Sequence, residues 1–313
     1  MPESAPPKSR PPKSRPPESA PLRIAVLGVG RIGSAFAFHL AGAGRHDVTV
    51  IARPGSPRLQ QLQRDDGIVT TKGERAGVRI SDTLDEQTPY DLIIVTLLAF
   101  QVDAVLPALR RSAAKSIQFM FVTFEPERLR EAVGADRCAF GMPFIQSDFD
   151  SDGRLKATIG AGGQKSIMSR RRWVDVFTAA GLPAALEPDM PLWLRCHVPL
   201  SIAFESISVA GVRRGGGATW AEAVTIARGV RESFTLIAAL GYAIHPRAKA
   251  RIAAAPVALV ATVLWSMSRI KPFRELLATG ENECRALVDT LVAAAPGAKP
   301  PVDVAKIAAM KPS

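Results

Sequence analysis

Short apolar runs, separated by stretches of mixed polarity, dominate the first half of the chain. From Arg23 onward the runs predict strands, and the mixed stretches between them predict helices. The expected strands cover 23–27, 47–52, 91–96, 117–123 and 138–145, and the expected helices cover 32–43, about 101–111 and 127–133. Continuous apolar strands separated by helices are typical of a parallel sheet that is covered on both faces. The pattern therefore predicts an α/β fold with a Rossmann-type, doubly wound parallel sheet.

The pattern changes after Asp152-Gly153. A short hairpin return (154–160), a helix near 167–180 and a strand at 182–187 complete the expected sheet domain. Beyond Leu192 the apolar positions follow a 3.6-residue period, which predicts an all-helical second domain. Within it, Thr219 and Glu222 have the spacing of a capping box, so we expect a helix to begin there and to end near Leu240.

These patterns divide the chain into three parts. Residues 1–22 repeat a Pro-Pro-Lys-Ser-Arg unit and carry few apolar groups, so we expect a disordered, partly polyproline II tail. Residues 23–187 are expected to form the sheet domain and residues 188–313 the helical domain, with a linker at 187–191. The sequence leaves open whether the helical domain also forms a homodimer.

A glycine motif follows the first expected strand. The six residues Gly28, Val29, Gly30, Arg31, Ile32 and Gly33 match the dinucleotide fingerprint G-x-G-x-x-G between a strand and a helix. The first glycine allows a tight turn, the second lets a pyrophosphate approach the backbone, and the third lets the helix pack close to the strand. The phosphates would lie at a helix N-terminus, where unpaired N–H groups favour negative charge.

The end of the second expected strand bears on the choice of nucleotide. In NAD-binding proteins an acidic residue at this point binds the ribose 2′-hydroxyl. Here the sequence after the strand is Arg53-Pro54-Gly55, without an acid. Arg53 is placed to pair with a 2′-phosphate, so the sequence favours NADP over NAD. The alternative is a solvated loop arginine.

Composition and charge narrow the class further. Hydrophobic content of 47% and charged content of 22% are typical of a soluble globular protein, and the formal charge of +11 suits an anionic cofactor and an anionic substrate. An aromatic content of 6% and the lack of a nucleic-acid motif argue against nucleic-acid binding. Three widely spaced cysteines predict neither a disulfide framework nor a metal site and fit a reducing cytoplasm. We expect no signal peptide and no membrane span.

The order of these parts resembles the ketopantoate reductase (2-dehydropantoate 2-reductase) family. The motifs that carry the resemblance are the glycine fingerprint, Arg53, the segment 96–101, the segment Trp193-Leu194-Arg195, and the segment from Ser268 to Glu281. The resemblance implies an NADPH-binding sheet domain, a helical substrate domain, and a cleft between them where a 2-keto acid is reduced. It also implies that Leu98, Gln101, Thr123 and Glu281 contact the cofactor. Ser268 is implied to contact the substrate.

The chain departs from the family where chemistry is expected. Arg195 stands where the resemblance implies a proton-donating lysine, and Pro199 and Ala203 stand where it implies asparagines that hold substrate hydroxyls. The chain contains a single asparagine, Asn282. A site that reads hydroxyls through amides loses about 1–3 kcal/mol for each partner left unpaired. Recognition of ketopantoate through those amides is therefore excluded.

The remaining groups still allow carbonyl reduction. Arg195 can polarise a carbonyl and hold a carboxylate, but its pKa above roughly 12 prevents it from giving up a proton. His197 is the nearest titratable donor, and water is the alternative. The competing interpretations are a structural ion pair of Arg195 with Glu205 and a core or surface histidine at 197. We therefore expect an NADPH-dependent reductase of a small carbonyl acid, or else a protein that binds or senses NADP(H) without turnover.

Overall fold

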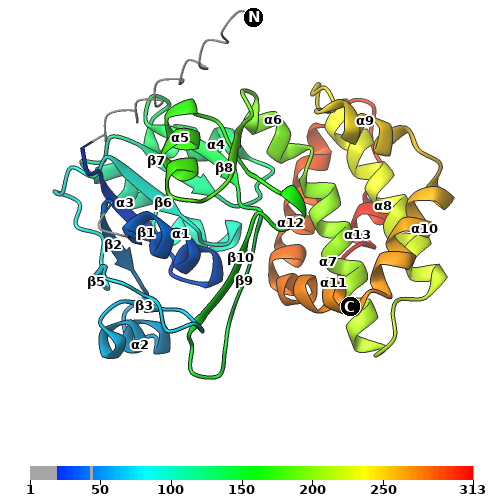
Figure 1. Cartoon of the computed structure of the whole chain (residues 1–313). Helices are drawn as coiled ribbons and strands as arrows, with labels where there is room; N and C mark the ends of the chain where they lie inside the picture. The colour runs from blue at the N-terminus through cyan, green and yellow to red at the C-terminus, as the bar shows by residue number, and fades with distance from the viewer. Residues whose placement is uncertain (1–19, 43–44, 313) are drawn as a thin grey trace, which may run out of the picture.

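The computed structural model describes residues 20–42 and 45–312 and divides them into a sheet half and a helical half that lie side by side (Figure 1). The expected Pro-rich tail lies outside these ranges except for its last three residues. The expected α/β architecture followed by an all-helical region is confirmed.

An eight-stranded sheet is the centre of the first half. Its order is β12-β11-β8-β7-β6-β1-β2-β5, and all its neighbouring strands run parallel except the pair β8 and β11. The strands are β1 (Arg23–Leu27), β2 (Asp47–Ile51), β5 (Arg79–Ser81), β6 (Leu92–Val95), β7 (Ile117–Met120), β8 (Cys138–Met142), β11 (Ser166–Met168) and β12 (Ala184–Leu186). Because β1 lies between β2 and β6, the order of connection reverses at β1. In open α/β sheets, ligands bind at the carboxyl ends of the strands beside such a point.

Two small antiparallel sheets accompany the large one. They are formed by β3 (Ile68–Val69) with β4 (Arg75–Ala76) and by β9 (Ile145–Phe149) with β10 (Leu155–Ile159). The strand expected at 138–145 is confirmed over Cys138–Met142 but wrong at its end, because the chain leaves the main sheet after Met142 and β9 belongs to a separate hairpin. This hairpin runs down the side of the sheet half that faces the helices (Figure 1).

Helices cover both faces of the large sheet. They are α1 (Arg31–Ala41), α2 (Pro57–Asp65), the 3-10 helix η2 (Ala99–Ala104), α3 (Leu106–Arg111), α4 (Pro126–Val133), the 3-10 helix η3 (Ala161–Gly163) and α5 (Arg171–Ala179). On one face, α1 and α5 pack together through Phe36 and Phe177, whose ring centroids are 5.0 Å apart. On the other face, α3 and α4 bury Leu109 and Leu129 against the strands. The doubly wound arrangement follows from strands that are apolar on both sides.

The regular elements described in the second half are all helices. Its elements are α6 (Met190–Arg195), α7 (Val198–Arg213), α8 (Trp220–Ala239), α9 (Arg247–Ala254), α10 (Val257–Ser268), α11 (Lys271–Leu277), η4 (Ala278–Gly280), α12 (Glu281–Ala294), η5 (Ala295–Gly297) and α13 (Val304–Ala308). The capping box at α8 is confirmed, because the Thr219 hydroxyl accepts from the Glu222 N–H and the Glu222 carboxylate accepts from the Thr219 N–H. The expected domain boundary at 187–188 stays a prediction, since Met190 and Trp193 of α6 pack in the sheet's apolar cluster.

No single helix in the described ranges is long and apolar enough to cross a membrane. Only α9 and α10 taken together reach that length and composition, and they are bent by 108° at the break between them.

Candidate functional site

The glycine motif forms a tight turn at the carboxyl end of β1. Gly28 has a positive φ of 96°, which favours glycine, and its N–H bonds the Ile51 carbonyl at 3.2 Å. A Cβ on Gly33 would collide with the Gly28 carbonyl oxygen and with the Thr96 hydroxyl, which itself donates to that carbonyl. Thr96 follows β6, so the two strands beside the reversal point fix the turn together.

The middle glycine of the motif has free space beside it. A Cβ on Gly30 would meet no atom within 4 Å, and Gly30 is the N-cap of α1, whose first hydrogen bond runs from the Ser34 N–H to the Gly30 carbonyl at 2.9 Å. Val29 is buried and Ile32 is half-buried, so these two residues anchor the turn on its inner side. The turn therefore fits a dinucleotide pyrophosphate, which would lie against Gly30 at the N-terminus of α1.

The loop after β2 presents Arg53 to solvent. Arg53 is exposed, its carbonyl accepts from the Ser56 N–H at 3.1 Å, and its guanidinium forms no hydrogen bond or ion pair within the described chain. Three residues later, Ser56 caps α2 by accepting from the Leu59 N–H at 3.2 Å. Arg53 is thus an unengaged cation beside a helix N-terminus, which is the environment that a 2′-phosphate needs.

Sequence reasoning missed Arg58, although it contacts the fingerprint directly. Its guanidinium donates to the Val29 carbonyl at 3.2 Å, to the Ser34 hydroxyl at 2.8 Å and to the Gly153 carbonyl at 3.2 Å, and it lies 4.3 Å from the Phe149 ring centroid. Burial lowers the pKa of Arg58 to about 10, so the group stays charged at neutral pH. No local signal identified it, because its partners come from segments about 30 and 95 residues away in sequence.

The fingerprint residue Arg31 also bonds the β9–β10 hairpin. Its guanidinium pairs with Asp148 at 3.1 Å, and its carbonyl accepts from the Ser147 hydroxyl at 2.9 Å. Arg31 remains partly exposed, at 43% of its side chain. A bound pyrophosphate could therefore recruit this guanidinium from a solvent-exposed partner.

The other predicted cofactor residues lie where the carboxyl edge of the sheet meets the helical half, a region called the junction below. Leu98 and Gln101 belong to the turn around η2, where the Gln101 side chain accepts from the Leu98 N–H at 3.2 Å, and η2 packs on α12. Thr123 follows β7, is buried, and accepts from the Glu125 N–H at 3.1 Å. Val122 and Phe124 on either side of it are part of the helical core, so the loop after β7 joins the two halves.

Arg195 is the last residue of α6 and is 4% exposed. It forms an ion pair with Glu127 of α4, and its guanidinium lies 3.8 Å from the Tyr242 ring centroid. The structural ion pair considered from the sequence is therefore present, but Glu205 was the wrong partner, because α6 ends at Arg195 and α7 begins at Val198, so Arg195 and Glu205 do not share a helix face. Direct contact of Arg195 with a substrate stays a prediction.

His197 lies in the break between α6 and α7 and faces the sheet half. Its ring stacks on Trp193 with centroids 4.5 Å apart and meets Phe144 edge-on at 6.3 Å. Burial, with a contribution from the nearby Lys249 ammonium, lowers the pKa of His197 to about 3. The imidazole is therefore neutral near pH 7 and would donate a hydrogen bond as a neutral ring, as in enzymes that polarise a carbonyl with neutral histidine.

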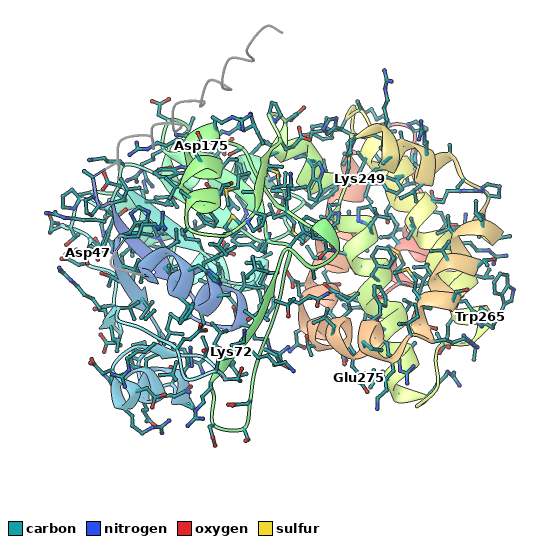
Figure 2. The ribbon with its side chains drawn as sticks, in the orientation of Figure 1. Asp47, Lys72, Asp175, Lys249, Trp265 and Glu275 are labelled. Atoms are coloured by element: carbon teal, nitrogen blue, oxygen red, sulfur yellow. The ribbon has the colours of Figure 1, made fainter. Side chains whose placement is uncertain are left out.

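Lys249 of α9 supplies the charge beside this ring. Its Nζ donates to the Trp193 carbonyl at 2.6 Å and lies 3.4 Å from the Trp193 ring centroid. The side chain is almost fully buried in the upper part of the helical half (Figure 2), and burial lowers its pKa to about 7. The sequence predicted no role for Lys249, because it lies 56 residues from the tryptophan that it contacts.

Two carboxyl groups approach each other between α7 and α12. Glu205 of α7 lies against Gly280, because a Cβ added to Gly280 would be 2.8 Å from the carboxyl carbon of Glu205. Glu283 is in the first turn of α12. Burial and the neighbouring Glu283 carboxylate raise the pKa of Glu205, and burial raises the pKa of Glu283. Both side chains are only partly buried, and the Glu205 Oε2 atom bonds no other atom of the described chain. The pair therefore holds a proton at neutral pH close to the junction.

The two remaining predicted residues are engaged within the fold. Glu281, expected at the cofactor, is held by Arg285 at 2.8 Å and Arg213 at 2.9 Å, and its hydrogen bond with Arg285 is the main cause of its lowered pKa. Ser268, expected at the substrate, is fully buried, accepts from the Ala218 N–H at 3.0 Å and donates to the Trp265 carbonyl at 2.7 Å. Both assignments stay predictions.

Comparison with known proteins extends this description. Residues 24–167 match the sequence profile of the family described as ketopantoate reductase PanE/ApbA. None of the curated proteins matches the chain. Among solved structures, a PanE/ApbA family ketopantoate reductase from Ralstonia eutropha JMP134 is 19% identical with a TM-score of 0.69, covering 93% of this chain and 96% of that one. A complex of D-mandelate dehydrogenase with NADH is 14% identical with a TM-score of 0.68, covering 92% and 96%. Yersinopine dehydrogenase with NADP+ is 11% identical with a TM-score of 0.68, covering 93% and 89%.

The fold is a Rossmann-type domain followed by a helical second domain, and the family match over the first of these indicates an NAD(P)-dependent oxidoreductase. Residues 24–167 of the chain match the ketopantoate reductase family, which supports a divergent relationship to that family. The resemblance drawn from the sequence is thereby confirmed.

Proposed function

We propose that the protein is an NADPH-dependent oxidoreductase that reduces a small anionic carbonyl compound at the junction. The observation that carries the proposal is the fingerprint at the reversal point of the sheet, with free space at Gly30 and the unengaged Arg53 nearby. The first fits a pyrophosphate and the second a 2′-phosphate. Bound NADPH would supply the hydride.

The protein's own groups then polarise the carbonyl and provide the proton. Neutral His197 donates a hydrogen bond to the substrate oxygen from the start of α7. The proton that completes the reduction comes from the Glu205–Glu283 pair by way of solvent, because Glu205 lies eight residues along α7 from His197, about 12 Å at the rise of an α-helix, and the raised pKa values of the pair favour its protonated form. Arg195 attracts the substrate carboxylate or holds Tyr242 in place, and the basic chain as a whole favours an anionic substrate.

The test separates the cofactor site from the fold. Gly30→Val adds a side chain where the protein has free space but replaces the N-cap of α1, so we expect the free energy of unfolding to fall by no more than about 1 kcal/mol. The NADPH affinity should fall at least about 100-fold, because the pyrophosphate can no longer approach the backbone. Calorimetric titration with NADPH and chemical denaturation measure the two quantities.

Arg53→Ala tests the nucleotide preference in the same assay. Losing a charge-assisted contact of about 1.5–3 kcal/mol should weaken NADPH binding about 10- to 100-fold and leave NADH binding unchanged. Equal effects on both nucleotides would contradict the 2′-phosphate assignment. A wild-type protein that binds neither nucleotide would contradict the whole proposal.

A second candidate function is NADP(H) binding without turnover. The observation that favours it is that Arg195 and Ser268 are both engaged inside the fold. A panel of 2-keto acids including glyoxylate, pyruvate, phenylglyoxylate and ketopantoate, followed by NADPH absorbance, distinguishes the two functions. Tight NADPH binding with no oxidation across the panel would favour the second.

A further inference from the structure

A hollow of about 260 Å³ opens on the helical half, apart from the junction. Its floor contains Leu200 and Ala203 of α7 and Val230 of α8, and α9 and α10 form its walls. The hollow exists because the chain bends by 108° between α9 and α10, so the two helices diverge instead of packing side by side. Figure 1 shows α8 and α10 on the side of the helical half that lies away from the sheet.

The lining of the hollow is apolar except at one point. Leu259 and Val263 of α10, one helical turn apart, are 56% and 46% exposed at its rim. The single charged lining residue is Arg251 of α9, which is exposed and forms no ion pair within the described ranges. An apolar recess with one unpaired cation at its edge is complementary to a molecule with an apolar body and an anionic end.

The charge of the surrounding sequence supports an anion and argues against a second copy of the chain. Between Glu232 and Glu275 the sequence contains no acidic residue and six lysines or arginines. With a formal charge of +11, two copies meeting through this surface would repel each other. The size argues for a small molecule, since an apolar cavity of roughly 150 Å³ is enough for one aromatic ring, whereas pockets for drug-sized ligands span roughly 300–1,000 Å³.

We propose that this hollow is a binding site for a small amphipathic carboxylate, with a medium-length alkyl chain or a single aryl group seated between α7, α9 and α10 and its carboxylate on Arg251. Leu259 and Val263 cover the apolar body of the ligand. The site is separate from the nucleotide site, because its lining residues all come from the helical half and none belongs to the fingerprint. Helix α7, which forms part of the floor of the hollow, also contains Glu205.

Isothermal titration calorimetry of the full chain without nucleotide tests the proposal. Octanoate is the probe, and octanol and octylamine are its neutral and cationic counterparts. We expect octanoate to bind about tenfold more tightly than octanol, because the carboxylate gains a charge-assisted hydrogen bond, and octylamine to bind most weakly. Since NADPH is absent, this result stands or fails independently of the proposed function.

Two variants locate the binding. Arg251→Ala should weaken octanoate about tenfold and leave octanol unchanged, and Leu259→Asp should weaken octanoate at least tenfold by placing a like charge at the rim. The matched controls are Arg247→Ala, on the same helix but outside the lining, and Leu276→Asp, an exposed leucine on α11. We expect both controls to change the octanoate affinity by less than threefold.

Several results would overturn the proposal. These are absence of octanoate binding, equal binding of octanoate and octylamine, and octanoate binding that neither variant weakens. Cosedimentation with phosphatidylglycerol vesicles that Leu259→Asp abolishes, with no octanoate binding, would instead assign the surface to a membrane. A dimer in analytical ultracentrifugation that Leu259→Asp dissociates would assign it to a second copy of the chain.

Discussion

The sheet half and the helical half carry their candidate functional groups in different ways. At the fingerprint, the backbone itself forms the site, through the positive φ of Gly28, the close approach of Gly33 and the free space at Gly30. In the helical half, the groups are side chains brought together from distant segments, such as Lys249 on Trp193 and Glu205 beside Glu283. The first kind of site is encoded in a few consecutive residues, and the second kind depends on how whole helices pack.

The largest effect should come from the backbone site. Gly33→Val forces a side chain into the Gly28 carbonyl and the Thr96 hydroxyl, so we expect a loss of about 3 kcal/mol in the free energy of unfolding and no measurable NADPH binding. Urea denaturation and calorimetry measure both. Gly77→Ala is the control, because a Cβ there meets no atom within 4 Å. A stable, NADPH-binding Gly33→Val protein would remove the contrast between the two halves.

A smaller effect is expected where side chains join the halves. Glu127→Gln leaves the buried Arg195 without its carboxylate partner, which should lower the free energy of unfolding by about 2 kcal/mol. The loss stays below that of a fully buried pair, because Glu127 is 46% exposed. Comparing Glu127→Gln, Arg195→Ala and the double variant isolates the pair energy. If the loss in the double variant equals the sum of the two single losses, the ion pair does not couple α4 to α6.

The third prediction concerns pH. The pKa of Glu205 is raised from its ordinary value of 4.5 to about 9 in the folded protein. Between pH 4.5 and about 9, the folded protein therefore holds a proton that the unfolded chain has lost. The free energy of unfolding therefore falls as pH rises through this window, by at most about 1.4 kcal/mol per pH unit for one proton. Glu205→Gln should flatten this fall of stability above pH 4.5, called the alkaline slope below. Denaturation at several pH values measures it.

Glu281→Gln is the matched control for that experiment. The pKa of Glu281 is lowered by Arg285 and Arg213, so its contribution is present above its ordinary pKa and is lost as pH falls. The control should change only the acidic side of the profile. An unchanged alkaline slope in Glu205→Gln would show that the carboxyl pair does not hold a proton in the folded protein.

Much of the sheet half could be predicted from the sequence, because local patterns determine it. The apolar runs identified β1, β2, β6 and β7, and the fingerprint identified the turn after β1. The strand expected at 138–145 failed at its end because tertiary contacts decide where an extended segment leaves the sheet. The β9–β10 hairpin owes its position to such contacts, with Arg31 and Arg58 among them.

The helical half was predicted as a class but not as a set of contacts. Periodicity and the Thr219 cap identified helices, but periodicity cannot show that α6 stops at Arg195 and that α7 restarts at Val198. That interruption separates Arg195 from the face of Glu205 and leaves His197 between Trp193 and Phe144. Lys249 could not be found from sequence, since only the packing of α9 brings it to Trp193.

The bonds from Arg58 and Ser147 to the fingerprint have a consequence for local opening. Segments that share several hydrogen bonds tend to unfold as one cooperative unit, with a common opening free energy. The glycine turn and the β9–β10 hairpin should therefore exchange their amide hydrogens at correlated rates, although they lie more than 110 residues apart in sequence. Thermal fluctuation would then expose the nucleotide-binding turn only when the hairpin detaches with it.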